Sequence, residues 1–577
     1  MFSARLRWLS FGLTASFLLI LVRLFYWQIL AGPRLQALGL LQYQTQRRQE
    51  PGRGQILSAD DYPLAINQTD YSLYVYKPAL TLDVERLSAQ LAPYFLPGPL
   101  IATAGSELLA MANDQAAQTF QQVLTTDSTW VPLAHHLDAS LKARLEALNL
   151  PGLSFEANAT RLYPEASLAA QLIGFVGSDE AGYPRGYFGL EGFYHRALSG
   201  VPGSLRSETD LLGRPIIFGA YQQIEALNGR SLKTHLDRGL QLLVESQLRQ
   251  GLRRYAADAG EVIVMDPTTG AILALAALPN FDPNHYSEFL SAAYRLPAIA
   301  ETYEPGSTFK LLVLAAALNE AVVTPETTCD QACQGPVKIG PYTIKTWDNQ
   351  YHPGQTVSQI LARSDNVGMV YLARLLGQAQ LSQYLEAFGI GQPSGVDLEG
   401  ETVVPLRQSW GEIDLATAAF GQGVAVNSLQ MLAAVNAIAA AGQRFQPQVV
   451  ASLIEPDGNQ VNLEPRPVNQ VLRPETAKIM TELMVGAVAH GEAKWSLPQG
   501  YRLAGKTGTA QIPISGHYDQ DKTIASFIGF APADQPRFAM LVKLREPQTS
   551  PWASETAAPL WFNLAQAIFV YLNIPPS

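Results

Sequence analysis

The sequence predicts a mixed α/β fold behind a single N-terminal transmembrane helix. An uncharged apolar run opens the chain at Trp8–Val22. In the second half, strand patterns lie at 261–276 and at 502–544, with helical patterns between them. Strands at both ends of a domain, with helices between, are typical of one sheet covered by helices. We therefore expect 261–276 to lie beside 502–544.

Length and composition narrow the class of protein. A chain of 577 residues is expected to hold about two to four domains. With 47% hydrophobic and 16% charged residues, it has the composition of a folded protein. The formal net charge is −10, and the sequence has no basic stripe with interleaved aromatic residues. Nucleic acid is therefore not expected as the main partner.

The N-terminus has the pattern of a membrane anchor. Arg5 and Arg7 precede an apolar run over 8–30. About 23 apolar residues can span a bilayer, and arginines before the run favour a cytoplasmic N-terminus. A cleaved signal peptide is the alternative, but the run is long and its end, Phe25-Tyr26-Trp27, is typical of an aromatic belt at the membrane interface. We expect 1–7 in the cytoplasm, an uncleaved anchor, and the rest of the chain outside.

The chain after the anchor divides near 225–233, which predicts one domain at 31–228 and another at 229–577. The first domain has strand patterns and helical patterns in alternation, with frequent glycines that favour short elements near its end. Its predicted strands are 53–57 and 71–75, its predicted helices are 82–96 and 139–148, and its glycine-rich part is 161–215.

The second domain begins with an amphipathic helix and ends with an apolar one. Between them, turn residues after Met265 predict a β-hairpin, and three further strands precede the last helix. The predicted elements are helix 236–254, hairpin 261–276, helical regions 311–390 and 415–441, strands 502–512, 523–530 and 538–544, and helix 557–572.

The two cysteines, Cys329 and Cys333, lie four positions apart. In an oxidising compartment they can pair across a tight loop. A zinc site that includes His352 lacks a clear fourth ligand, and two unpaired thiols are a further alternative. We favour the disulfide and expect neither a metal nor a cofactor.

One short stretch, Tyr303–Lys310, carries a candidate nucleophile. Its Pro-Gly turn precedes Ser307, and the apolar run that follows predicts a buried helix with Lys310 on the same face as the serine. At the N-terminal end of a helix a lysine is more easily kept neutral, and a serine beside a neutral amine is a candidate nucleophile. The alternative is that Ser307 caps the helix and that Lys310 is solvated.

Two further triplets favour the catalytic interpretation. They are Ser364-Asp365-Asn366, between two helical regions, and Lys506-Thr507-Gly508, within a predicted strand. Lys-Thr occurs four times in the chain, but glycine follows only at position 506. With the Ser307 motif, these triplets resemble the signature of penicillin-binding proteins and class A β-lactamases.

The resemblance to class B penicillin-binding proteins extends over most of the chain. Similar segments are Arg161-x-Tyr163-Pro164, Gly174-Phe175-Val176-Gly177, Gly189-Leu190-Glu191-Gly192, Met265-Asp266-Pro267, Gly421-Gln422-Gly423 and Lys506-Thr507-Gly508-Thr509-Ala510-Gln511. The resemblance implies an elongated α+β pedestal (dimerisation-like) domain at 31–228. It also implies a transpeptidase domain at 229–577, built as an antiparallel sheet with helices.

The resemblance also implies a reaction. Ser307 attacks a stem peptide that ends in D-Ala-D-Ala, D-Ala leaves, and the acyl group passes to an amine of a neighbouring strand. Lys310 can accept the proton if burial lowers its pKa, although the first base is disputed in this family. Ser364 is suited to relay a proton, and the amide of Asn366 to hold the substrate peptide.

Substrate recognition is expected at the third motif. Lys506 and the hydroxyls of Thr507 and Thr509 suit a terminal carboxylate. Gly508 has no side chain, so we expect the substrate peptide to lie against this strand. By resemblance, the backbone N–H groups of Ser307 and Thr509 form the oxyanion hole.

Two alternatives share these motifs: a β-lactam sensor or β-lactamase-like hydrolase, and a catalytically silent cell-wall scaffold. A hydrolase has no need of a pedestal of roughly 200 residues, and the presence of every motif side chain disfavours a silent site. The resemblance further implies inhibition by β-lactams, a bacterial cytoplasmic (inner) membrane location and a glycan polymerase partner of the shape, elongation, division and sporulation family. The sporulation or division branch is slightly favoured over elongation.

Overall fold

The computed structural model describes residues 2–96, 105–208, 216, 221–514 and 517–576. The chain forms two compact units, Met1–Arg53 with Ser199–Gly229, and Gly54–Leu198 with Arg230–Ser577. The predicted division of the chain at 228/229 stays a prediction.

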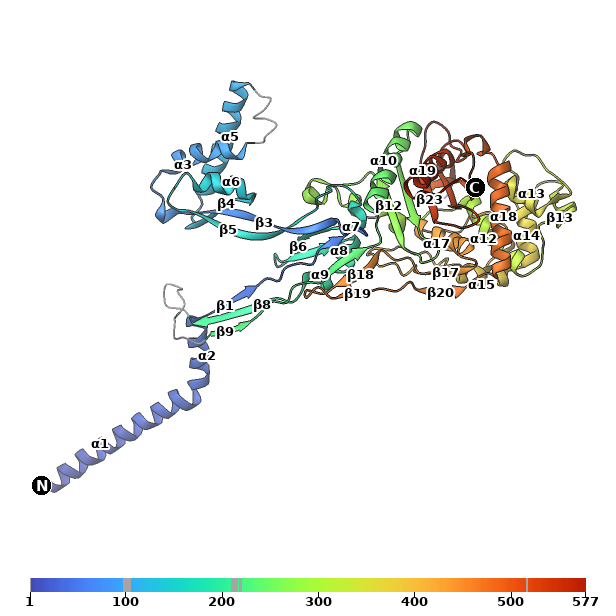
Figure 1. Cartoon of the computed structure of the whole chain (residues 1–577). Helices are drawn as coiled ribbons and strands as arrows, with labels where there is room; N and C mark the ends of the chain where they lie inside the picture. The colour runs from blue at the N-terminus through green and yellow to red at the C-terminus, as the bar shows by residue number, and fades with distance from the viewer. Residues whose placement is uncertain (1, 97–104, 209–215, 217–220, 515–516, 577) are drawn as a thin grey trace. The chain divides into compact units, whose positions relative to one another are not determined.

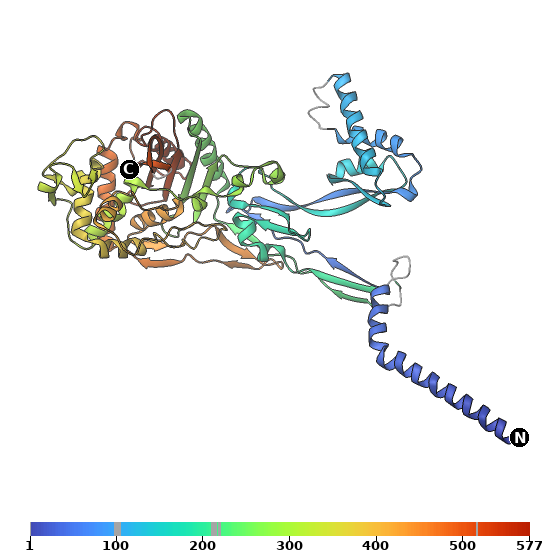
Figure 2. The same ribbon diagram turned by 180° about the vertical axis from the view of Figure 1, so that it is seen from behind.

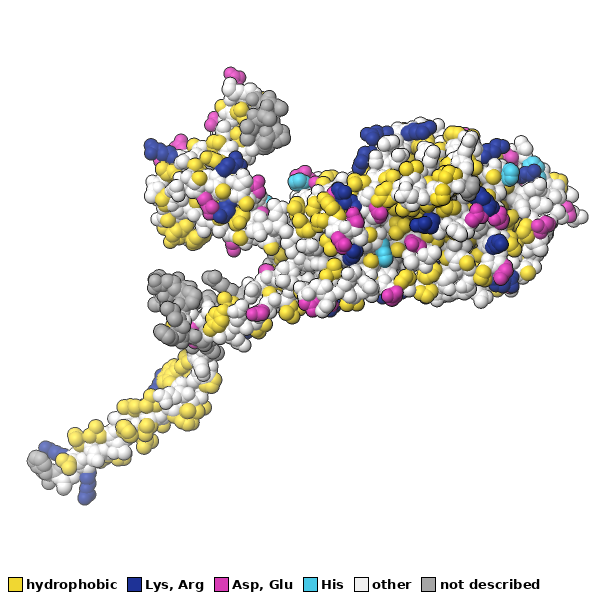
Figure 3. All heavy atoms as spheres, viewed as in Figure 1, with side chains coloured by type: hydrophobic (Ala, Val, Ile, Leu, Met, Phe, Trp, Pro, Cys, Tyr) yellow, Lys and Arg dark blue, Asp and Glu magenta, His cyan; other side chains and the backbone are white. Residues whose placement is uncertain are grey.

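The first unit contains the N-terminal helix and a small antiparallel sheet with the strand order β1-β8-β9. Ser3–Leu30 is one helix that is long and apolar enough to cross a membrane. Its apolar side chains are exposed along its length (Figure 3). The elements are α1 (Phe2–Phe25), η1 (Tyr26–Leu30), α2 (Gly32–Tyr43), β1 (Gln44–Gln49), β8 (Gly203–Glu208) and β9 (Tyr221–Ile224).

The second unit begins with a sheet centred on one long strand, β3 (Pro63–Tyr76), which pairs with both β4 and β5. Alternate residues of β3, including Leu73 and Val75, are buried against helices, as the predicted pattern at 71–75 requires. The predicted helices at 82–96 and 139–148 are also confirmed. The elements are β2 (Ile56–Leu57), α3 (Val84–Leu91), η3 (Ala92–Phe95), α5 (Ser106–Leu124), β4 (Trp130–Leu137), α6 (Ala139–Glu146) and β5 (Leu153–Leu162).

The same sheet continues into strands from the second half of the chain. β2 pairs in parallel with β10 (Ser231–Thr234), which pairs with β18 (Val450–Ile454), and β18 pairs with β19 (Gln460–Asn462). Backbone hydrogen bonds therefore connect the segment around Ile56 to residues almost 400 positions later.

Short elements follow β5, as the recurrent glycines predict. They are α7 (Ala170–Ile173), β6 (Phe175–Ser178), β7 (Pro184–Tyr187), α8 (Gly189–Phe193) and α9 (His195–Ser199). An ion pair holds this region to β5: Nε of Arg161 lies 2.7 Å from Oε1 of Glu191, and the side chains are 3% and 0% exposed. Because both charges are buried, loss of either residue would leave the other charge buried without a partner, which would destabilise the fold.

A five-stranded antiparallel sheet, β12-β11-β23-β22-β21, forms the centre of the second half (Figures 1 and 2). It brings 261–276 beside 502–544, as predicted, with Val262 opposite Val542. Both faces are buried: Val262 and Val264 pack beneath α10 and α19, and Ile263 faces the opposite core. The elements are α10 (Arg238–Tyr255), β11 (Ala259–Met265), β12 (Ile272–Leu278), β21 (Ala504–Ile514), β22 (His517–Ala531), β23 (Phe538–Arg545) and α19 (Ala557–Tyr571).

Helices cover the second face of this sheet, but the predicted helical region 311–390 is not continuous. Short strand pairs interrupt it between 328 and 356, where Pro and Gly residues favour turns over helix. Cys329 and Cys333 form a disulfide in this segment. The elements are α11 (Pro297–Ala300), η6 (Gly306–Phe309), α12 (Lys310–Asn319), β13 (Thr328–Cys329), β14 (Val337–Ile339), β15 (Tyr342–Ile344), β16 (Gln355–Thr356), α13 (Val357–Ala362), α14 (Asn366–Leu376), α15 (Gln378–Ala387), α16 (Glu412–Ala418), α17 (Ser428–Ala439) and α18 (Pro474–His490).

Candidate active site

Ser307 lies in the short 3₁₀ turn η6, which leads directly into α12. Two glycines let this turn pack closely. Gly306 has φ +55°, and a Cβ there would lie 2.9 Å from the carbonyl oxygen of Thr509. A Cβ on Gly421 would lie only 2.2 Å from the carbonyl oxygen of Gly306. The turn is therefore fixed between β21 and the loop that contains Gly421.

Lys310 is the first residue of α12 and is fully buried. Its Nζ donates hydrogen bonds to the carbonyl oxygen of Ser364 at 2.6 Å, to Oδ1 of Asn366 at 2.7 Å and to Oγ of Ser364 at 3.3 Å. Burial lowers the pKa of Lys310 well below its usual value, and the nearby positive charge of Lys506 lowers it further. This environment favours the neutral form of the Lys310 amine, three residues after Ser307.

The second motif forms the loop between α13 and α14. Ser364 has φ +55°, a left-handed conformation that is uncommon outside glycine. Asp365 caps α14, since its Oδ1 accepts a 3.0 Å hydrogen bond from the N–H of Gly368, and its Oδ2 accepts one from Gln355. Asn366 begins α14, and its Nδ2 donates to the carbonyl oxygen of Lys345 at 3.1 Å. These contacts fix the loop that carries Ser364.

The third motif lies on β21, which is an edge strand of the five-stranded sheet. Lys506 is 5% exposed, and its Nζ donates to Oγ1 of Thr507 at 3.1 Å. Burial lowers the pKa of Lys506 to about 8, against the opposing effect of the Glu492 carboxylate. Oγ1 of Thr509 accepts a 3.1 Å hydrogen bond from the N–H of Ala553.

The structure adds a packing reason for the glycine at position 508. A Cβ at this position would point away from the cavity, to 2.7 Å from Cγ2 of Thr308 and 2.8 Å from Oγ of Ser526. Glycine therefore also allows β21 to pack tightly against the Ser307 turn.

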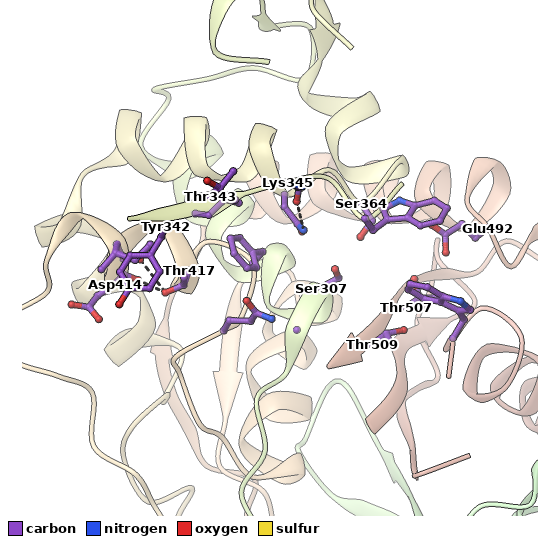
Figure 4. A pocket seen from close by; sticks show the side chains of 18 residues that line it. Ser307, Tyr342, Thr343, Lys345, Ser364, Asp414, Thr417, Glu492, Thr507 and Thr509 are labelled. Atoms are coloured by element: carbon purple, nitrogen blue, oxygen red, sulfur yellow. Dashed lines mark hydrogen bonds between the residues drawn. The ribbon is translucent and has the colours of Figure 1, made fainter. Parts of the chain in front are cut away.

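One cavity of about 560 Å³ joins the three motifs. Figure 4 shows Ser307, Ser364 and the two threonines of β21 around it. Lys310 and Lys506 lie behind this surface and are reached through their neighbours. The motif residues that line the cavity are Ser307, Ser364, Asn366, Thr507 and Thr509.

Other residues that line the cavity belong to none of the three motifs. Trp347 and Trp552 meet edge to face, with ring centroids 5.8 Å apart. Glu492, just after α18, contributes a carboxylate. No sequence pattern connects these three residues, which only the fold brings to one place.

Two family models match the chain: the penicillin-binding protein transpeptidase domain at 260–566, and the penicillin-binding protein dimerisation domain at 48–234. The chain belongs to the class B penicillin-binding proteins. The described geometry of the three motifs therefore lies within its transpeptidase domain.

Named relatives agree with this family. The chain is 31% identical to stage V sporulation protein D of Bacillus subtilis, over 98% of this chain and 85% of that protein. It is 29% identical to peptidoglycan D,D-transpeptidase FtsI of Escherichia coli, over 78% of this chain and 73% of the relative. Penicillin-binding protein 2X of Streptococcus thermophilus shares the fold, with a TM-score of 0.74 at 22% identity over 92% of this chain and 81% of that one.

Proposed function

We propose that this class B penicillin-binding protein cross-links peptidoglycan as a serine D,D-transpeptidase, with Ser307 as its nucleophile. The observation that carries the assignment is the buried Lys310 amine, which contacts both Ser364 and Asn366 behind the serine. A neutral amine there can accept the serine proton, directly or through the Ser364 hydroxyl.

The reaction follows in two steps. Oγ of Ser307 attacks the carbonyl carbon between the two terminal D-Ala residues, and D-Ala leaves with a proton. An amine of a neighbouring stem peptide then attacks the ester, and Ser307 regains its proton. The backbone N–H groups of Ser307 and Thr509 are suited to stabilise the oxyanion in both steps.

Recognition of the donor is assigned to β21. Lys506 supplies a positive charge just behind the hydroxyl of Thr507, which lines the cavity with Thr509. The outer edge of β21, which pairs with no strand among the described residues, can accept an extended peptide as an added strand. A β-lactam with a carboxylate is expected to occupy the same place and to acylate Ser307.

The alternatives are less well supported. A hydrolase or β-lactam sensor needs the transpeptidase-type domain only, whereas this chain also matches the dimerisation domain at 48–234. A silent scaffold does not require the Lys310 contacts. The match to a sporulation protein favours the sporulation or division branch of the family.

The N-terminal helix is assigned as a single-pass anchor in the bacterial cytoplasmic membrane. Arg5 and Arg7 favour a cytoplasmic N-terminus, which would place the catalytic domain outside. A membrane-embedded glycan polymerase of the shape, elongation, division and sporulation family is the proposed partner, through the anchor and the pedestal domain.

Release of D-Ala tests the assignment. The purified full chain, given a pentapeptide donor and an acceptor stem peptide, should release D-Ala and form the cross-linked dimer. Ser307→Ala should do neither. Rapid hydrolysis of β-lactams without dimer formation would instead favour the hydrolase.

A further inference from the structure

A row of polar residues crosses the five-stranded sheet beneath the Ser307 turn. Glu261 on β11 lies opposite Lys543 on β23. The row continues to Ser526 on β22 and ends at Gly508 on β21, a residue of the third motif. The side chains of the first three residues are buried. The reaction as described above uses none of them.

Glu261 and Lys543 form an ion pair, in which Nζ of the lysine lies 2.8 Å from Oε1 of the glutamate. Burying two charges costs desolvation free energy, and two apolar residues of similar volume often stabilise a fold equally well or better. Val262 and Val542, the next opposite pair on the same two strands, are apolar and fully buried. Stability alone therefore does not explain two charges in this part of the sheet.

The Lys543 ammonium also contacts the ring of Tyr303. Nζ lies 4.6 Å from the ring centroid, which is within the range of a cation–π interaction, and such an interaction strengthens when the cation is removed from water. In the part of the chain that the structure describes, the Glu261 carboxylate and this ring are the two partners of the ammonium. Tyr303 lies four residues before Ser307, so the ammonium supports the segment that carries the nucleophile.

This segment is held from two sides. On one side, the backbone of Tyr303 exchanges hydrogen bonds of 2.9 and 3.0 Å with the backbone of Val426. On the other side, Tyr303 lies on Lys543, and Thr308 packs against the Gly508 end of the polar row. The polar row therefore influences how the nucleophile's turn rests on the sheet.

We propose that Glu261 and Lys543 are positioning residues for acylation. The carboxylate holds the ammonium beneath the Tyr303 ring, and the ring fixes the nucleophile's turn against β21. The inference rests on the proposed function, in which the backbone N–H groups of Ser307 and Thr509 stabilise the oxyanion. One of these groups belongs to the turn and the other to β21, so their spacing depends on how the turn rests on the sheet. Misplaced donors stabilise the oxyanion poorly.

Apolar replacement of the ion pair tests the inference in the full chain. The double variant Glu261→Leu, Lys543→Met leaves no unpaired buried charge, so its melting temperature should stay near that of the wild type. Its rate constant for acylation by fluorescent penicillin should fall about tenfold, the equivalent of one desolvated cation–π contact. The dissociation constant of the initial complex should not change, because β21 still binds the penicillin. Stopped-flow measurements over a range of penicillin concentrations separate the two quantities.

Variants of Tyr303 test whether the ion pair acts through the ring. Tyr303→Phe keeps the face of the ring and should be acylated at nearly the wild-type rate, whereas Tyr303→Leu should be slowed as much as the double variant. Adding Tyr303→Leu to the double variant should cause little further loss, because the contact is already absent. Two independent structural effects would instead give losses that multiply.

The chain offers a matched control at the start of α10. Nη2 of Arg238 lies 2.6 Å from Oε1 of Glu165, and its Cζ lies 4.1 Å from the ring centroid of Tyr62. These residues combine a carboxylate, a cation and a ring in the same way, but none of them lines the catalytic cavity. Arg238→Met should therefore leave the acylation rate unchanged.

The outcomes distinguish the positioning role from the proposed function. Wild-type acylation rates in the double variant or in Tyr303→Leu would overturn the positioning role and leave the transpeptidase intact. A weaker initial complex with an unchanged rate constant, or an equal loss of rate in Arg238→Met, would also overturn it. If the double variant does not fold, the comparison of Tyr303→Phe with Tyr303→Leu decides. If the wild type is not acylated at all, the proposed function itself fails.

Discussion

Nζ of Lys310 donates a 2.7 Å hydrogen bond to Oδ1 of Asn366. The bond joins the first residue of α12 to the first residue of α14, so two motifs 56 positions apart are held by one amine. Lys310 is therefore both the candidate base and the contact that keeps the Ser364 loop in place.

Replacing Lys310 should slow acylation more than binding. In Lys310→Ala the penicillin acylation rate should fall about 10²- to 10⁴-fold, because the general base is lost. Stopped-flow measurement of label incorporation separates the rate from the initial affinity. An unchanged rate would remove Lys310 from the mechanism, and a melting temperature like that of wild type would show that the variant still folds.

Acylation should weaken at alkaline pH because of Lys506. Burial lowers the pKa of this lysine to about 8, so the ammonium that attracts the donor carboxylate is lost as pH rises through that value. The rate of acylation by a carboxylate-bearing β-lactam should therefore fall along the alkaline limb of its pH–rate profile. In Lys506→Arg the limb should move to higher pH, since arginine keeps its charge. If the alkaline limb stays at the same pH in this variant, a group other than Lys506 causes the fall in acylation rate.

Gly508→Ala should reduce acylation through packing. Its Cβ would contact Cγ2 of Thr308 behind β21. Adding Thr308→Ser removes this methyl group, so the double variant should recover part of the lost acylation rate and melting temperature. No recovery, together with a melting temperature unchanged in Gly508→Ala, would favour the earlier expectation that glycine clears room for substrate.

The buried Arg161–Glu191 pair should be essential for stability. Arg161→Ala leaves a carboxylate with 0% exposure, so the free energy of unfolding should fall by about 3–5 kcal/mol. Arg230→Ala, which breaks an ion pair whose side chains are 49% and 28% exposed, is the control and should cost about 1 kcal/mol or less. If denaturant titrations show that Arg161→Ala and Arg230→Ala lose the same free energy of unfolding, burial of the Arg161–Glu191 pair is not what makes it important.

The chemistry could be predicted from the sequence because acyl transfer needs particular residue types. Ser307, Ser364 and Lys506 were found as motifs, and they line or support one cavity. The sheet was also predictable, since strand patterns separated by turns occur within 261–276 and within 502–544. A sheet with helices on both faces requires apolar residues on both.

The rest depends on contacts between distant segments. The cap formed by Asp365 could have been found, because Asp at the position before a helix is a common start signal. The contact of Thr509 with Ala553, and the meeting of Trp347 with Trp552, left no local pattern. The short strands between 328 and 356 were missed because each is only two or three residues long, too short to show an alternating pattern.

Covalent labelling tests the central claim most directly. The full chain is incubated with fluorescent penicillin, digested and mapped by mass spectrometry. The account predicts one acyl adduct, on the peptide that contains Ser307, and no label on Ser307→Ala. A label that persists on Ser307→Ala, or an adduct on Ser364, would contradict the assignment of the nucleophile.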